Sequence, residues 1–282
     1  MKMHIMPIRR NLKFHVPDDK VLNWHSWGPT VTQFFNTLSL FFPEGERFFI
    51  NSVRKYRDRI EDPELQEAVR AFIGQEAMHG REHEDYNQKM VEAGLPVDTQ
   101  EAIVSKLLDV ISKYTPNALQ LSATVALEHL TAILADILLR EPDLIDDSDE
   151  SYQRLWHWHA LEETEHKAVA FDVYQTVFGS GIKAWALRSV GLILATTIFF
   201  SLFYPFYLIN TWKVGQLFNL KGWWLSFKFQ WLKPGGLRRV VIPWLDWFKP
   251  NFHPWDHDNR EFLAEMDNLI GDADGYQKNE AA

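Results

Sequence analysis

Apolar residues recur at steps of three and four along four long stretches of the chain, which is the spacing of one face of an α-helix. In the first stretch, residues 30–55, the apolar pattern has one gap, and Glu46 fills it. The second stretch has Pro63 at an N-terminal helical position and carries Glu76 and His79 on its apolar stripe. The pattern therefore predicts amphipathic helices whose inward faces include ionisable side chains.

The third and fourth stretches repeat this arrangement. Residues 116–139 have a single inward acid, Glu128. Residues 151–178 place three polar side chains where core residues belong, namely His159, Glu163 and His166. Gly179 follows and is expected to end this helix. The inward residues of the whole chain thus include Glu, Glu-x-x-His, Glu and Glu-x-x-His, in that order.

This order predicts an all-α fold, a ferritin-like four-helix bundle that holds two metal ions. A glutamate and a histidine three residues apart lie about 5–6 Å from each other on one helix face, so both can reach one ion or two adjacent ions. A bundle that presents one Glu from each of two helices and Glu-x-x-His from the other two has six ligands for two ions. Residues 92–112 would form the longer connection between two helical hairpins, after a stop signal at Gly94.

The alternative is that these side chains are solvated on exposed helix faces. The apolar stripes on which they lie predict burial instead, and a buried charge without a partner is strongly unfavourable. Metal cations would reconcile four buried carboxylates with an apolar surround. Glu44 competes with Glu46 for the first position, but it lies off the stripe.

Three segments carry a resemblance to a known family: residues 42–49, 75–83 and 162–167. They resemble the bacterial family of predicted metal-dependent hydrolases, over about residues 5–270. The ligand pattern itself is similar to that of the ferritin-like di-iron proteins. His159 precedes Glu163 by four residues, and the resulting His-x-x-x-Glu-x-x-His resembles the p-aminobenzoate N-oxygenases. The resemblance implies seven metal ligands: Glu46, Glu76, His79, Glu128, His159, Glu163 and His166.

The sequence has further histidines outside this set of seven residues, at His83, at His129 and in the segment 253–258. His83 follows His79 by four residues on the same stripe, so it is either an eighth ligand or a partner that orients a ligand. His129 is rotated by about 100° from Glu128 on a helix, which favours a structural role. The segment 253–258 contains two histidines but lies in a region rich in Pro and Trp, and we expect it to be a loop.

The donor types narrow the choice of metal and chemistry. Carboxylates and imidazoles suit Fe, Mn or Zn, and the chain has no Cys. Two Fe ions are favoured, with Mn, mixed Fe/Mn and Zn as alternatives. The expected enzyme is a di-iron oxygenase or oxidase that uses O2 and an electron donor to oxidise an apolar, lipid-like substrate. The alternative is a metal-dependent hydrolase with a hydroxide on two metals as nucleophile. Phenylalanines of the first stretch are candidates for lining a substrate tunnel: Phe34, Phe35, Phe41, Phe42, Phe48 and Phe49.

Charge is distributed unevenly along the chain. The net charge is −9 overall, yet residues 173–245 contain eight Lys and Arg and no acid, which gives this segment +8 and the remainder −17. Residues 189–212 are a run without any charge, long enough to span a bilayer, although Pro205 lies within it. Trp and Phe alternate with Lys and Arg after the run, a composition typical of the membrane–water interface.

These features predict two segments, a metal-binding bundle over residues 1–180 and a helical, aromatic and basic appendage over residues 181–282. The appendage is expected to associate with a membrane as a re-entrant hairpin or interfacial helices. A helix pair packed on the bundle or forming a homodimer contact, and a single span, are the alternatives. The N-terminal segment lacks the apolar core of a signal peptide. We therefore expect a cytoplasmic protein, peripheral or monotopic at the inner face of the cell membrane, that does not bind nucleic acid.

Overall fold

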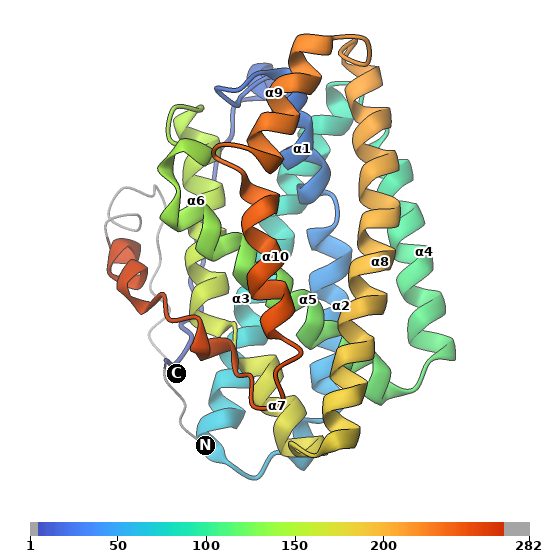
Figure 1. Cartoon of the computed structure of the whole chain (residues 1–282), viewed down its shortest axis with the longest axis vertical. Helices are drawn as coiled ribbons and strands as arrows, with labels where there is room; N and C mark the ends of the chain where they lie inside the picture. Colours follow the sequence, from blue (N-terminus) through green and yellow to red (C-terminus); the bar gives the residue numbers. More distant parts are fainter. Residues whose placement is uncertain (1–4, 268–282) are drawn as a thin grey trace.

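The computed structural model describes residues 5–267, and every regular element within that range is an α-helix or a short 3-10 helix. The all-α prediction is confirmed. Most of the long helices run along the long axis of the molecule (Figure 1). The α-helices are α1 (Pro29–Ser39), α2 (Phe42–Arg54), α3 (Pro63–Glu92), α4 (Val97–Tyr114), α5 (Asn117–Arg140), α6 (Glu150–His166), α7 (Val169–Phe178), α8 (Ile182–Lys213), α9 (Leu220–Trp231) and α10 (Gly236–Asp246). The 3-10 helices are η1 (Asp18–Lys20), η2 (Arg57–Arg59), η3 (Pro142–Leu144), η4 (Pro254–Asp256) and η5 (Arg260–Glu265).

The first predicted helix is in fact two helices, because the helical conformation is interrupted between Ser39 and Phe42. Pro43 explains the break. Its ring has no N–H and would clash with the carbonyl of Ser39, four residues earlier, so a continuous helix is excluded and Pro43 instead occupies the first turn of α2. The prediction of one helix over residues 30–55 is therefore wrong, although Glu46 remains on the buried face of its shorter helix.

The fourth predicted helix is also divided, into α6 and α7, immediately after His166. Lys167 lies at the break and is buried. Its ammonium donates to the carbonyl of His257 at 2.6 Å and to the Asn259 side chain at 2.6 Å, so the C-terminal segment holds the break in place. The prediction of one helix over residues 151–178 is wrong at this point, because the apolar phase resumes after the break and conceals it.

Three other boundaries agree with the sequence. The Asp62 side chain caps α3 by accepting from the backbone N–H of Glu64, and Gly94, with a φ of 90°, follows its end. Gly179, with a φ of 73°, ends α7. The predicted connection between hairpins is itself mostly a helix, α4, which begins directly after Pro96.

The four helices that carry the candidate ligands, α2, α3, α5 and α6, form the centre of the bundle. Helix α2 packs on α3, and α5 packs on α6. Around them lie the other helices: α8 packs along α5 and α1, α10 packs on α5, and α9 packs on α1. Helix α5 is therefore covered on several sides, whereas α8 lies at the outside of the molecule (Figure 1).

The uncharged run of residues 189–212 lies within one continuous helix, α8. Pro205 is inside that helix without ending it. The chain does not reverse direction within the run. Membrane association of the appendage stays a prediction. Within residues 5–267, two helices are long and apolar enough to cross a membrane by length and composition alone: α5, with 67% of its most apolar window buried, and α8, with 28%. The division of the chain at residue 180 stays a prediction.

Candidate metal centre

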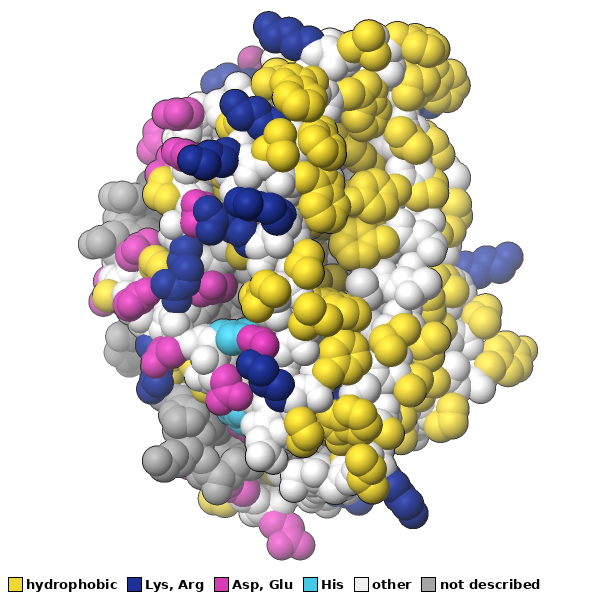
Figure 2. Space-filling model, in the orientation of Figure 1, with side chains coloured by type: hydrophobic (Ala, Val, Ile, Leu, Met, Phe, Trp, Pro, Cys, Tyr) yellow, Lys and Arg dark blue, Asp and Glu magenta, His cyan; other side chains and the backbone are white. Residues whose placement is uncertain are grey.

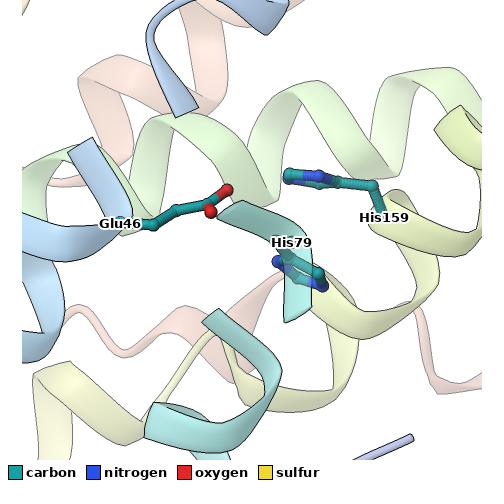
Figure 3. Close-up of side chains that lie close together, drawn as sticks. All are labelled: Glu46, His79 and His159. Atoms are coloured by element: carbon teal, nitrogen blue, oxygen red, sulfur yellow. The ribbon is translucent and has the colours of Figure 1, made fainter. Parts of the chain in front are cut away.

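The seven predicted ligands come together at the middle of the bundle. One is on α2 and one on α5, two are on α3, and three are on α6. All are buried, with exposed fractions of 4% or less. Figure 3 shows the Glu46 carboxylate pointing toward the rings of His79 and His159. The helical phase of the sequence thus placed each of these side chains on the correct face of its helix.

Their donor atoms form overlapping groups in which all atoms lie within 4.8 Å of one another. The groups are Glu46 with His79 and His159, Glu76 with His79 and Glu163, and Glu76 with Glu128 and His166. Because the groups share members, they form one cluster with two ends. One end has His79 and His159, and the other has His166.

Glu163 lies between these two ends. Its Oε1 is 3.2 Å from Nε2 of His159 and 3.7 Å from Nδ1 of His79. Its Oε2 is 3.5 Å from Nε2 of His166, which is also 3.1 Å from Oε1 of Glu76. Each carboxylate oxygen of Glu163 therefore faces a different end of the cluster, which is the arrangement of a carboxylate that bridges two ions.

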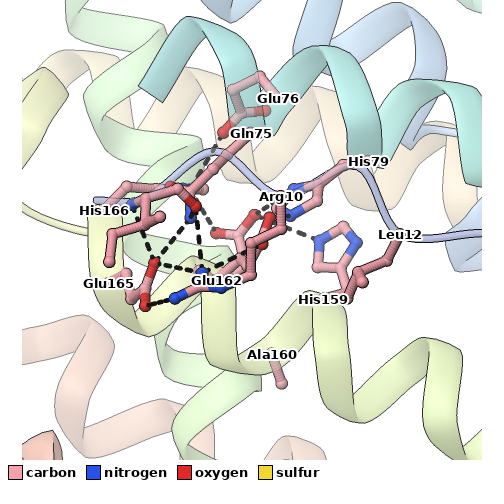
Figure 4. Close-up of polar contacts among 12 residues, drawn as sticks. Arg10, Leu12, Gln75, Glu76, His79, His159, Ala160, Glu162, Glu165 and His166 are labelled. Atoms are coloured by element: carbon pink, nitrogen blue, oxygen red, sulfur yellow. Dashed lines mark hydrogen bonds and ion pairs between the residues drawn. The ribbon is translucent and has the colours of Figure 1, made fainter. Parts of the chain in front are cut away.

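The three histidines are oriented by hydrogen bonds on the side of each ring that faces away from the cluster. His79 Nε2 is 3.1 Å from Glu162, and His166 Nδ1 is 3.1 Å from the Gln75 amide oxygen (Figure 4). His159 Nδ1 is 2.9 Å from His83. In each ring the other nitrogen points into the cluster. Such a partner on the outer nitrogen fixes the ring and the tautomer of a metal-binding histidine.

Apart from the Glu163 carboxylate, which accepts from Thr131, the inward atoms have no hydrogen-bond partner. Both carboxylate oxygens of Glu46, Glu76 and Glu128 are buried without one, and so are the inward ring nitrogens of the three histidines. Buried polar atoms are normally hydrogen-bonded, since an unpaired one is costly. Metal cations would satisfy all of them at once, and the oxygen and imidazole donors match Fe, Mn or Zn. The residues present therefore fit a pair of metal ions.

The electrostatics of the cluster lead to the same conclusion. Burial, followed by repulsion from Glu76, holds the pKa of Glu46 well above its usual value, and burial raises the pKa of Glu76 to about 7. Burial also raises the pKa of Glu128. For Glu163, burial opposes ionisation, but attraction and hydrogen bonding to His166 and His159 together outweigh it, and the pKa is lowered. Without cations the cluster must retain protons that cations would displace.

Sequence reasoning missed the residues behind the cluster. Glu162 and Glu165 are buried beside the ligands of α6. Arg10, from the N-terminal segment, lies 3.3 Å from Glu162 and 2.7 Å from Glu165, and Gln75 donates to Glu165 at 2.8 Å. Three glutamates within four residues were a usable signal for the first two. Arg10 carries no local signal, because its partners lie more than 150 residues away in the chain.

His83 is placed as a partner of a ligand. Its Nδ1 is 2.8 Å from the Ser39 hydroxyl and its Nε2 is 2.9 Å from His159, so both ring nitrogens are already hydrogen-bonded. Of the two roles that the sequence left open, the geometry favours the orienting role. Glu44 lies outside the cluster and forms an ion pair of 3.5 Å with Arg47.

The remaining histidine segments also lie outside the cluster. His129 is buried, 3.2 Å from the carbonyl of Pro243, and its ring stacks on Trp247. The segment 253–258 includes the short helix η4, which the sequence did not predict. There His257 is 3.0 Å from Asp246, at the surface end of α10. His129 and the segment 253–258 therefore make contacts that hold the fold together, and neither contributes a donor atom to the cluster.

Two apolar cavities adjoin the cluster. One of about 240 Å³ lies among α2, α4, α5 and α8, and Glu46 forms part of its wall. The other, of about 80 Å³, is bordered by His159 and Glu163. Thr131 borders both, and its hydroxyl donates to Glu163 at 2.7 Å. The phenylalanines named from the sequence all line these cavities: Phe41, Phe42, Phe48 and Phe49 the larger one, and Phe34, Phe35 and Phe42 the smaller.

Comparison with protein families matches residues 8–258 to the family described as predicted metal-dependent hydrolase. The match covers most of the chain and includes all seven candidate ligands. No curated protein and no solved structure matches the chain.

Proposed function

The chain belongs to the family of predicted metal-dependent hydrolases, and from this premise we propose that it is a hydrolase whose buried carboxylate and histidine cluster binds two metal ions and acts on an apolar substrate. The observation that carries the proposal is the set of buried donor atoms without hydrogen-bond partners, directly beside an apolar cavity. Bound metal ions would polarise the scissile group and make water a stronger nucleophile.

The protein's own residues would prepare the site for this chemistry. Glu46 belongs both to the cluster and to the cavity wall, so it lies where substrate and metal would meet. The apolar lining would bind the hydrocarbon part of a substrate and exclude bulk water, which strengthens electrostatic interactions. Glu162, Gln75 and His83 would hold the three histidine rings in place.

O2-dependent oxidation by two Fe ions is a second candidate, and a specific observation favours it. The larger cavity is lined almost wholly by apolar side chains, with Thr115, Thr131 and Glu46 as its polar ones. A hydrolase must place an ester or amide group, whereas an oxidase can act on an unactivated hydrocarbon. Such an enzyme would also need an electron donor.

The two candidates are separated by metal analysis combined with two activity assays on the same purified chain. We expect about two metal ions per chain and hydrolysis of a long-chain p-nitrophenyl ester that does not change when O2 is removed. Iron-dependent O2 uptake by the reduced protein, without ester hydrolysis, would instead establish the oxidase.

The ligand assignment is tested by Glu128→Ala and Glu163→Ala, with Glu44→Ala as the matched control. Each of the first two removes a buried inward carboxylate, so both the bound metal and the activity should be lost. Glu44 lies outside the cluster, and its variant should keep both. Metal content that is unchanged in all three variants would show that the cluster is not the metal site.

A further inference from the structure

The helices α8, α9 and α10, with the turn between α8 and α9, carry a continuous apolar surface that is exposed. The most exposed side chains on these helices and the turn are Phe218 (88%), Leu220 (82%) and Ile182 (74%), followed by Ile242, Trp224 and Trp212. In Figure 2 hydrophobic side chains extend over these helices from end to end, while acidic side chains gather on the opposite side of the view. We call this the α8–α10 surface. Apolar patches of such extent mark interaction sites.

The charges around the α8–α10 surface indicate which partner it suits. Residues 173–245 contain no Asp or Glu. Exposed cations border the apolar side chains at Lys213, Lys221, Lys233 and Arg238. Tryptophan beside lysine and arginine is typical of the boundary between lipid headgroups and acyl chains, and cations near an anionic bilayer strengthen binding by electrostatic attraction. A purely apolar protein partner would not require this excess of positive charge.

The large cavity reaches the same surface. Leu194 and Ile198 on α8 line the cavity, and they are also exposed, at 45% and 38%. Glu46, at the metal centre, is part of the same cavity wall. The lining residues of α8 extend from Gly191 to Leu202, a length of about 16 Å at the helical rise, so the cavity is elongated along the helices. An elongated apolar slot suits an acyl chain.

We propose that the α8–α10 surface rests on an anionic lipid bilayer and that the cavity beside α8 receives the acyl chain of a lipid from that bilayer, past Leu194 and Ile198. The substrate class, a lipid with a long acyl chain, rests on the proposed function. The contact with the bilayer does not, because it depends only on exposed side chains and charge.

Binding is tested by co-sedimentation of the full chain with vesicles, in its metal-free and metal-loaded forms. Vesicles that contain phosphatidylglycerol should bind it, and vesicles of phosphatidylcholine alone should bind it several-fold less. Phe218→Asp with Leu220→Asp should weaken binding by about tenfold or more, since apolar contact is lost and negative charge is added. Lys221→Glu with Lys233→Glu should weaken it similarly. Arg70→Glu, at an exposed position of α3 outside the α8–α10 surface, is the matched control and should leave binding unchanged.

Entry of the acyl chain is tested separately with a fluorescent long-chain fatty acid carried in the same vesicles. Ile198→Trp should fill the cavity mouth and reduce uptake several-fold, while vesicle binding is kept. Leu208→Trp is the matched control, because Leu208 is also exposed on α8, at 47%, but does not line the cavity. Equal uptake by both variants would overturn the acyl-chain part of the proposal.

Two further outcomes would overturn the contact with the bilayer. The first is no preference for anionic vesicles. The second is a homodimer in solution that dissociates in Phe218→Asp with Leu220→Asp while no vesicles bind, which would assign the surface to a second copy of the chain. All these measurements use metal-free protein as well. Failure of hydrolysis with intact vesicle binding and uptake would therefore reject the proposed function alone.

Discussion

Helices α5 and α8 pack against each other and are the two most apolar long helices among the described residues, yet they differ in what covers them. The most apolar window of α5 is 67% buried and that of α8 is 28% buried, although α8 is the more hydropathic of the two. Helix α5 directs Glu128 into the candidate metal centre and is enclosed by neighbours. Helix α8 has protein on one side only. Hydropathy alone therefore does not tell a core helix from a surface helix, and the placement of inward polar residues does.

The strongest test of this difference places one charge on each helix. Val125 on α5 is 1% exposed and Val190 on α8 is 47% exposed. Val125→Lys should lower the free energy of unfolding by ~3–5 kcal/mol, because the ammonium would be buried without a partner. Val190→Lys should change it by less than about 0.5 kcal/mol. Thermal unfolding followed by circular dichroism measures both, and an equal loss in the two variants would abolish the distinction between the helices.

Metal removal should act on α5 more than on α8, because α5 supplies Glu128 and α8 supplies no donor to the cluster. At a metal concentration about a thousand times the dissociation constant, bound metal adds ~4 kcal/mol to the free energy of unfolding. Chelation should therefore lower the melting temperature and speed amide hydrogen exchange around Glu128 more than in the exposed half of α8. Exchange that accelerates equally in both helices would contradict this.

The pH dependence of that effect has a defined sign. Burial raises the pKa of Glu76 from 4.5 to about 7 in the folded, metal-free chain, so the folded state holds this proton more tightly than the unfolded state does. The buried Glu76 carboxyl therefore does not destabilise the metal-free fold below about pH 4.5. Its destabilising effect on the free energy of unfolding grows as the pH rises toward 7. The difference in melting temperature between metal-loaded and metal-free protein should widen over this interval. A difference in melting temperature that narrows as the pH rises over this interval would contradict the prediction.

The smallest expected effect concerns the contact between the two helices. A Cβ at Gly191 of α8 would lie 2.0 Å from the Ser122 hydroxyl and 2.8 Å from its carbonyl oxygen on α5. Gly191→Ala should therefore destabilise the fold by ~1–3 kcal/mol as the helices are forced apart. A Cβ at Gly45 of α2 meets nothing within 4 Å, so Gly45→Ala should stabilise the fold by up to about 1 kcal/mol through helix propensity. Urea unfolding of both variants compares them, and stabilisation by both would mean that α8 does not pack closely on α5.

The sequence predicted the inward face of the bundle better than its interruptions. Helical phase placed Glu46, Glu128 and both Glu-x-x-His pairs correctly, because a buried stripe constrains each residue along it. The interruption before α2 has a local signal in the sequence, since Pro43 is unfavourable inside a continuous helix. The break after His166 could not be read, since the contacts that hold Lys167 come from a segment about 90 residues later.

The side chains around the candidate ligands could be predicted even less from the local sequence pattern. The role of His83 was decided by Ser39 on α1 and His159 on α6, two contacts that bring distant segments together. Tertiary partners of this kind leave no periodic signal. The exposed side of α8 is a similar case, because the apolar run was visible in the sequence but its one-sided packing on α5 was not.

The ion pairs of Arg10 with Glu162 and Glu165 have a consequence for the order in which the protein is assembled. Arg10 precedes these partners by 152 and 155 residues, so the N-terminal segment is synthesised long before α6 exists. Closing so long a loop is unfavourable until the intervening helices have packed and brought its ends together. A segment that is synthesised before α6 is thus among the last to reach its final position, and it completes the base of the candidate metal centre when it does.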